Sequence, residues 1–160
     1  MLIRDFEPRD VERIVEIAVA AWEPIYAYYR QTMGQELFEV VFPDWQTEKA
    51  GQVRRSCRSQ SSAQVCVAEV DGMVVGFITF YVHEGDRVGT IGNNAVHPQW
   101  QGQGIGPTLY EHVFARLRAL GFQAVRVSTG GDLSHAPARR AYEKAGFDVS
   151  LPEVTYYHKL

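Results

Sequence analysis

The N-terminal part of the chain combines a short apolar run with apolar residues at helical spacing. Residues 2–6 predict a strand, and the turn at 8–10 offers an acidic N-cap to a helix. The apolar face of this helix carries Val11, Ile14, Val15, Ala18 and Trp22. Pro24 should end or kink the helix, because proline has no amide hydrogen and its ring clashes with the preceding turn. Further helical stretches are predicted at 35–41 and at about 44–58, the second with Trp45, Val53 and Cys57 on one face.

The middle of the chain reads as an antiparallel meander. Strands are predicted at 64–70, 73–82 and 88–96. Asp71 and Gly72 form the two-residue turn of a hairpin, because both positions tolerate a positive φ angle. A second turn is marked by residues 85–86.

Helices and strands alternate in the last third of the chain. A helix is expected up to about Leu120, with Gly121 as the residue after its end. A strand at 124–128 and a helix at 137–145, stopped by Gly146, should follow, with closing strands at Val149 and 153–160. We expect one α/β domain over residues 1–160, with a mixed, mostly antiparallel sheet of about six or seven strands and about four flanking helices.

Composition excludes several classes of protein. The chain has 160 residues, 46% of them hydrophobic, and a net charge of −3, which offers no basic surface for nucleic acid. No apolar run reaches the roughly 18 residues that a membrane span needs, and no signal peptide is recognisable, so a cytoplasmic protein without a membrane partner is expected. Cys57 and Cys66 match no metal spacing and are expected to fill the core. The mildly acidic charge favours a cationic substrate.

A glycine-rich loop between a predicted strand and a predicted helix is the main candidate for chemistry. It reads Gln101-Gly102-Gln103-Gly104-Ile105-Gly106. Alternate glycines let consecutive N–H groups point at one guest, and the helix that follows adds unpaired N–H groups and a positive dipole end. Such a loop binds phosphate or pyrophosphate.

Two common phosphate-binding motifs do not fit this loop. A P-loop ends in Gly-Lys-Ser/Thr, whereas Gly106 is followed by Pro107 and Thr108. A dinucleotide fingerprint follows the first strand and pairs with an acid at the end of the next one, and the strand at 124–128 ends without an acid.

The order of motifs resembles the GNAT superfamily of acetyl-CoA-dependent N-acetyltransferases. The resemblance rests on three segments: Ala95-Val96-His97-Pro98, then the loop at 101–106, and then Arg140-Ala141-Tyr142-Glu143-Lys144-Ala145-Gly146-Phe147. It covers the whole chain and implies acetyl-CoA as co-substrate, with no metal.

The resemblance also implies roles for individual residues. A β-bulge is expected near Asn93 and Asn94, and the backbone of Asn94, Ala95 and Val96 would pair with the pantetheine arm. The Val96 N–H would polarise the thioester carbonyl, and Tyr142 would protonate the departing thiolate. The pyrophosphate would be wrapped by Gln101, Gly102, Gln103, Gly104, Ile105, Gly106 and Thr108.

Two features depart from the family pattern. His135 stands where relatives often have an asparagine that binds pantetheine; imidazole can also donate or accept a hydrogen bond. The glutamate that many relatives use as general base is missing, and the nearest carboxylates in the sequence are Glu84, Asp86, Asp132 and Glu23. The acceptor wall would lie between residues 22 and 45. The candidate acceptor-site residues are Trp22, Glu23, Tyr26, Tyr29 and Asn93.

The expected function is transfer of an acetyl group from acetyl-CoA to a primary amine of a small molecule or protein, by direct attack in a ternary complex. Two alternatives stay open. One is a GNAT-fold module that binds acyl-CoA without turnover, and the other is a transferase for another acyl-CoA or a hydroxyl acceptor. The aromatic pair Tyr156-Tyr157 is compatible with a homodimer.

Overall fold

The computed structural model describes residues 1–83 and 85–160 of the chain. In this part of the chain the strands are β1 (Leu2–Asp5), β2 (Ala63–Val70), β3 (Met73–Tyr81), β4 (Val88–Val96) and β5 (Ala124–Val127). The α-helices are α1 (Val11–Met33), α2 (Gln35–Val41), α3 (Trp45–Ser56), α4 (Ile105–Ala119) and α5 (Ala136–Lys144). Short 3-10 helices occur at η1 (Pro8–Asp10), η2 (Pro98–Trp100) and η3 (Leu133–His135).

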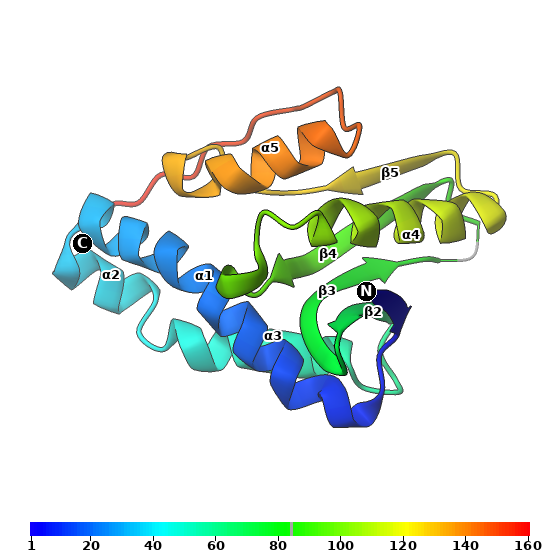
Figure 1. Cartoon of the computed structure of the whole chain (residues 1–160). Coiled ribbons are helices and arrows are strands. Elements are labelled where there is room, and N and C mark those ends of the chain that lie inside the picture. The colour runs from blue at the N-terminus through cyan, green and yellow to red at the C-terminus, as the bar shows by residue number, and fades with distance from the viewer. Residues whose placement is uncertain (84) are drawn as a thin grey trace.

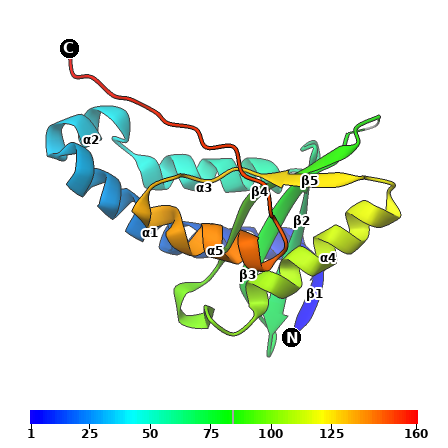
Figure 2. The ribbon, with the colours of Figure 1, turned by 90° about the horizontal axis from the view of Figure 1, so that it is seen from above.

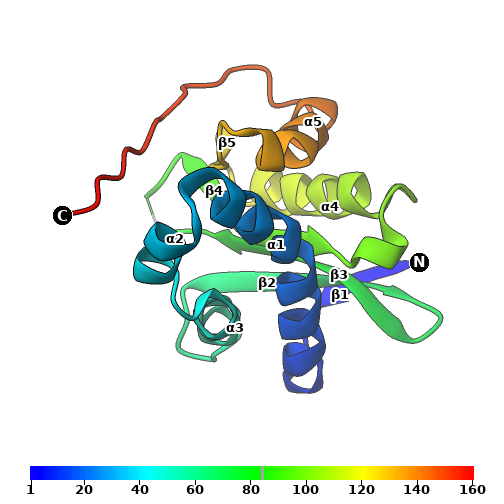
Figure 3. The same cartoon turned by 90° about the vertical axis from the view of Figure 1, so that its left-hand side faces the viewer.

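The strands form one sheet in the order β1-β2-β3-β4-β5 (Figure 1). The first three pairings are antiparallel, and β4 pairs with β5 in parallel. The predicted mixed α/β architecture is therefore confirmed. Helices α4 and α5 lie together on one face of the sheet, and α1 and α3 cover the other (Figure 3).

Alternation along the strands divides the core between the two faces of the sheet. Val67 and Phe77 pack with Ile14 of α1 and Val53 of α3, and all four side chains are buried. On the other face the buried cluster contains Cys66, Ile78, Phe80, Leu109, Val113 and Leu117. Cys57 belongs to the first cluster. The prediction that both cysteines are core residues is confirmed.

Pro24 does not end the first helix, contrary to one of the two outcomes expected for it. Helix α1 continues through Pro24 to Met33 and ends at Gly34, which has a φ angle of +79°. Pro24 is exposed to solvent. The helix is held on both sides of it, because α1 contacts α3, α2 and β4. Tertiary packing thus outweighs the lost backbone hydrogen bond.

The predicted closing strands are wrong. Residues 148–160 form no strand, so the sheet has five strands within the described residues instead of six or seven. Figure 2 shows this tail as an extended segment that passes toward α2, where Lys159 pairs with Glu36. The side chains of Val154 and Tyr156 are exposed. A sequence with strand-like composition becomes a strand only when a neighbouring edge supplies hydrogen-bond partners.

Candidate functional site

A β-bulge interrupts β4 close to Asn93 and Asn94, where the family resemblance implied one. On β3 the residues paired on either side are Ile78 and Phe80, whereas their partners on β4 are Asn94 and Ile91. One extra residue is therefore accommodated at 92–93. The buried hydroxyl of Thr79 donates to the carbonyl oxygen of Asn93 at 2.9 Å and fixes the bulge.

Beyond the bulge, β4 has an open edge. Its parallel pairing with β5 ends at Ile91 and Val127, while β4 itself continues to Val96. The His97 N–H donates to the Val75 carbonyl on β3 at 2.8 Å. Because successive residues of a strand direct their N–H and C=O groups to opposite edges, those of Val96 point away from β3. The Val96 N–H therefore lies on the open edge, as its expected role requires.

The glycine-rich loop follows this edge and opens α4. Gly102 and Gly104 have φ angles of +78° and +79°, which glycine adopts without strain, and Gly104 is the N-cap of the helix. In the part of the chain that the structure describes, none of the N–H groups of residues 102–106 donates to a protein acceptor. Five amide hydrogens are thus available at one helix end, which suits an anionic ligand.

Side chains around the loop have different tasks. The amide of Gln101 donates to the Val96 carbonyl at 3.0 Å and ties the loop to the open edge. Ile105 is buried in the core, so only its backbone faces the loop. The hydroxyl of Thr108 donates to the Gly104 carbonyl at 3.0 Å. Gln103 is exposed.

Tyr142 of α5 reaches the sheet beside the bulge. Its hydroxyl lies 3.4 Å from the amide nitrogen of Asn94, whose amide oxygen accepts from the Tyr110 hydroxyl at 2.7 Å. Burial raises the pKa of Tyr142, although the bonds to Asn94 and Tyr110 act against the rise. The Tyr142 hydroxyl therefore keeps its proton near neutral pH and can donate it.

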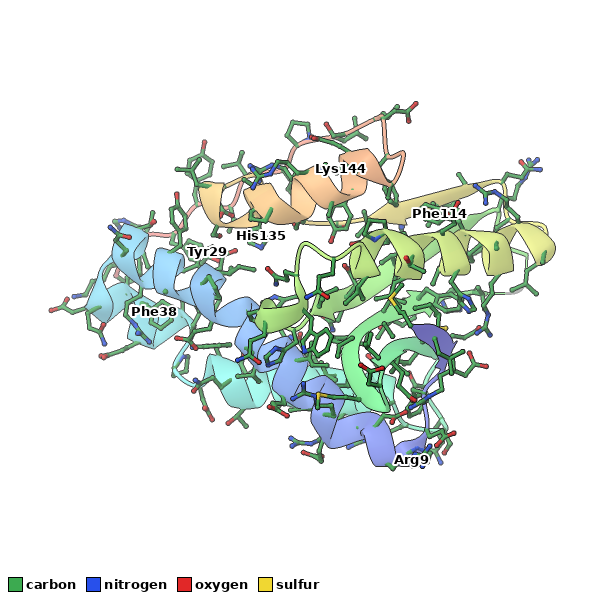
Figure 4. All side chains as sticks on the ribbon, viewed as in Figure 1. Arg9, Tyr29, Phe38, Phe114, His135 and Lys144 are labelled. Atoms are coloured by element: carbon green, nitrogen blue, oxygen red, sulfur yellow. The ribbon has the colours of Figure 1, made fainter. Side chains whose placement is uncertain are left out.

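His135 lies at the start of α5 and faces Tyr29 of α1 (Figure 4). The two ring centroids are 6.1 Å apart. The Nδ1 atom of His135 lies 2.8 Å from a carboxylate oxygen of Asp132. Burial alone would raise the pKa of Asp132, but hydrogen bonds from Ser134 and His135 lower it. Burial, assisted by Asp132, raises the pKa of Tyr29 to about 12.

The aromatic residues expected at the acceptor wall form a packed cluster. Tyr26 stacks on Trp45 with ring centroids 4.2 Å apart and meets Tyr29 edge-on at 5.8 Å. Phe38 and Phe42 complete the cluster. Tyr26 thus serves the packing of α1 against α2 and α3. Trp22 lies apart from it, with its ring under a lysine.

That lysine, Lys49 of α3, was missed by the sequence analysis. Only 7% of it is exposed. Its ammonium lies 4.2 Å from the centroid of the Trp22 ring and donates to the Asn93 amide oxygen at 3.2 Å. Burial lowers its pKa to about 8. The available signal was its position, four residues after Trp45 and four before Val53, within the apolar stripe of the helix.

The four carboxylates considered as general bases do not converge. Glu23 is exposed on α1, and Asp132 is paired with His135. Asp86 lines a cavity of about 440 Å³ beside the start of β4. Glu84 lies outside the described residues. The structure thus brings together Asn93, Asn94, Val96, the glycine loop and Tyr142, and none of the described candidate carboxylates joins them.

In residues 1–83 and 85–160, no three histidine, cysteine, aspartate or glutamate side chains group as metal ligands would. Over the same residues, no helix combines the length and apolar character that crossing a membrane demands.

The chain is similar to known acetyltransferases in sequence and in fold. An amino-acid acetyltransferase of Ralstonia nicotianae is 35% identical over 91 residues, which are 57% of this chain and 20% of that protein. The chain thus spans about a fifth of the length of this curated relative. The PaiA N-acetyltransferase from Thermoplasma acidophilum, solved with coenzyme A, has a similar fold, with a TM-score of 0.70 and 22% identity over 93% of this chain and 90% of its own.

A second solved structure extends the likeness of fold. A ribosomal-protein-alanine N-acetyltransferase from Brucella melitensis superposes with a TM-score of 0.59 and 19% identity, covering 99% of this chain and 98% of its own. The acetyltransferase (GNAT) family matches residues 13–147, which include the bulged strand, the glycine loop and Tyr142. The chain therefore belongs to the acetyltransferase (GNAT) family.

Proposed function

We propose that the protein, as one domain over residues 1–160, transfers an acetyl group from acetyl-CoA to a primary amine. The observation that carries this proposal is the open edge of β4 beyond Ile91, which leads directly to a helix end with unpaired N–H groups. An extended pantetheine arm can pair with such an edge as an added strand. Its pyrophosphate would then meet the amide hydrogens of residues 102–106.

The chain's own groups supply what the transfer needs. Acetyl-CoA brings an activated thioester, and the amine attacks its carbonyl carbon in a ternary complex. The Val96 N–H would donate to the oxygen that gains negative charge, as in other oxyanion sites. The Tyr142 hydroxyl would give its proton to the sulfur as the carbon–sulfur bond breaks. Holding both substrates on one strand edge contributes much of the rate.

An amine must lose a proton before or during attack, because an alkylammonium has a pKa near ~10.4. Because Glu23, Asp86 and Asp132 lie apart, we assign removal of this proton to water or to more than one carboxylate. His135, with its ring oriented by Asp132, would contact the pantetheine arm.

Binding and turnover test the proposal separately. Calorimetry should give a micromolar dissociation constant for acetyl-CoA, and a concentration 100 times that constant should add roughly 2.7 kcal/mol to the free energy of unfolding. A Gly104→Val variant should fold but lose this binding, because a β-branched residue resists a φ angle of +79° and crowds the pyrophosphate. Gly72→Val is the matched control, since residue 72 has a φ angle of +78° in the turn between β2 and β3, so the variant carries similar backbone strain outside the proposed site and should keep acetyl-CoA binding.

Release of free CoA over a panel of amines is the test of turnover. Acetylated product detected by mass spectrometry would support the transferase. Binding of acetyl-CoA with no product from any amine would favour a module that senses acyl-CoA. A thermal shift with NAD or ATP but none with acetyl-CoA would contradict the proposal.

A further inference from the structure

A small cavity adjoins the bulge of β4 on the face of the sheet that carries α3. It has a volume of about 320 Å³ and is lined by Gln52, Arg55, Ser56, Ser61, Tyr81 and Asn93. No carboxylate is among these lining residues. Asn93 immediately precedes Asn94, whose side chain approaches Tyr142 on the opposite face. The cavity and the proposed site therefore meet at the β4 bulge, one on each face of the sheet.

Two neighbouring arginines of α3 differ in their partners. Arg54 donates to both carboxylate oxygens of Glu12 on α1, at 3.0 and 2.7 Å. Arg55 forms no ion pair with any residue that the structure describes, and it lines the cavity. Its guanidinium thus keeps its planar set of donors for a ligand.

Lys49 orients the side-chain amides of Gln52 and Asn93, which thereby provide further hydrogen-bond donors. An ammonium can only donate, so the amide oxygens of Gln52 and Asn93 face it, at 3.0 and 3.2 Å. The NH₂ group of each amide is left without a protein acceptor in the described part of the chain. Both amides line the cavity. The cavity therefore offers hydrogen-bond donors to a ligand, and no carboxylate among its lining residues competes for these donors.

Lys49 also places an uncompensated charge behind these amides. It is almost fully buried and has no carboxylate partner within residues 1–83 and 85–160. Burial lowers its pKa to about 8. An anion bound in front of Gln52 and Asn93 would offset the hydration that Lys49 has lost. This local positive charge favours an anionic group, whereas the overall net charge of −3 had favoured a cationic substrate.

We infer that this cavity binds a carboxylate of the acceptor, so that the substrate is a small amine that also carries a carboxylate group. The carboxylate lies against Arg55 and the two amides, and the amine extends past Asn93 toward the open edge of β4. A carboxylate fits because it only accepts hydrogen bonds and matches the planar fork of an arginine. The inference rests on the proposed transferase function for its kinetic test, but not for its binding test.

The kinetic test compares acceptors that differ only in the carboxylate. Straight-chain ω-amino carboxylates are paired with alkylamines of the same length, whose amine pKa values are similar, and with aminoalkyl phosphonates. Wild type should favour the carboxylate member by about 10-fold or more in kcat/KM, the usual worth of a hydrogen bond to a charged group. Arg55→Gln should remove most of this preference through KM, and Arg54→Gln should retain it.

Several results would overturn the inference. They are equal use of both acceptors by wild type, a preference for phosphonates, or the same loss of preference in the Arg54 and Arg55 variants. Acetylation of alkylamines with no carboxylate preference would still support the transferase while refuting the cavity assignment.

A binding experiment keeps the inference testable without turnover. Ligand-observed NMR should detect 4-aminobutyrate bound to wild type and to the Arg54 variant, and at least about 10-fold weaker binding to the Arg55 variant. Lys49→Met should weaken binding in the same direction while its fold, checked by circular dichroism, stays intact. Failure of wild type to bind any amino carboxylate would refute the carboxylate site even if amines are acetylated.

Discussion

Gly92, inside the β4 bulge, is a position where adding one methyl group should disturb the proposed site. A Cβ atom at residue 92 would lie 2.6 Å from Oγ1 of Thr79 and 2.8 Å from a ring carbon of Tyr81. Thr79 is fully buried, and its hydroxyl holds the Asn93 carbonyl. In Gly92→Ala, either Thr79 rotates and releases this carbonyl, or the bulge shifts. Overpacking and the weakened hydrogen bond should together cost about 2–4 kcal/mol of unfolding free energy.

Urea unfolding followed by tryptophan fluorescence measures this cost. Gly131→Ala is the control, because nothing lies within 4 Å of its added Cβ and its φ angle is not positive, so it should stay within about 0.5 kcal/mol of wild type. Adding Thr79→Ala removes the clashing hydroxyl, so the double variant should lose less stability than the sum of the single variants. Equal stability of the Gly92 and Gly131 variants, or strict additivity with Thr79→Ala, would refute the reasoning.

Three further predictions concern chemistry and pH. Tyr142→Phe should lower kcat by roughly 100-fold with little change in the KM for acetyl-CoA, and a wild-type rate would make Tyr142 a packing residue. Asp132→Ala should reduce turnover by only about 10-fold, and a silent enzyme that still binds acetyl-CoA would identify a dedicated base. Lys49 should release its proton near pH 8 when folded but near pH 10.5 when unfolded. The unfolded state then binds more protons between these values, so wild type should gain about 3 kcal/mol of stability relative to Lys49→Met as pH rises from 7.5 to 10.5, and a flat difference would contradict the burial of its charge.

The sequence was sufficient to predict the backbone conformation where the residue type itself determines it. The turns at Gly72, Gly121 and Gly146 were predicted from residue type, and all three have positive φ angles. The left-handed N-cap at Gly104 is of the same kind. The helices and the meander followed from apolar periodicity, because a buried stripe repeats with the period of its element.

The errors come from partners that lie far away in the sequence. Pro24 was expected to end or kink the helix, as it would in an isolated helix. Contacts of α1 with α3 and β4 keep it helical. Residues 153–160 have strand-like composition but pair with no edge. Lys49 was not singled out from the sequence, because only the packing of α3 against Trp22 and Asn93 buries it. Pairing and burial of this kind depend on the assembled fold.

The bulge explains how one strand can serve both halves of the proposed reaction. Asn93 directs its side chain to Lys49 on the α3 face, whereas Asn94 directs its side chain to Tyr142 and Tyr110 on the α4 and α5 face. Since neighbouring residues of a strand alternate between faces, this division depends on register, and the register after the bulge is held by Thr79. A shift of one residue would exchange the two amides. In the proposed reaction, acceptor binding and protonation of the leaving group would thus be linked through a single backbone geometry, although they lie on opposite sides of the sheet.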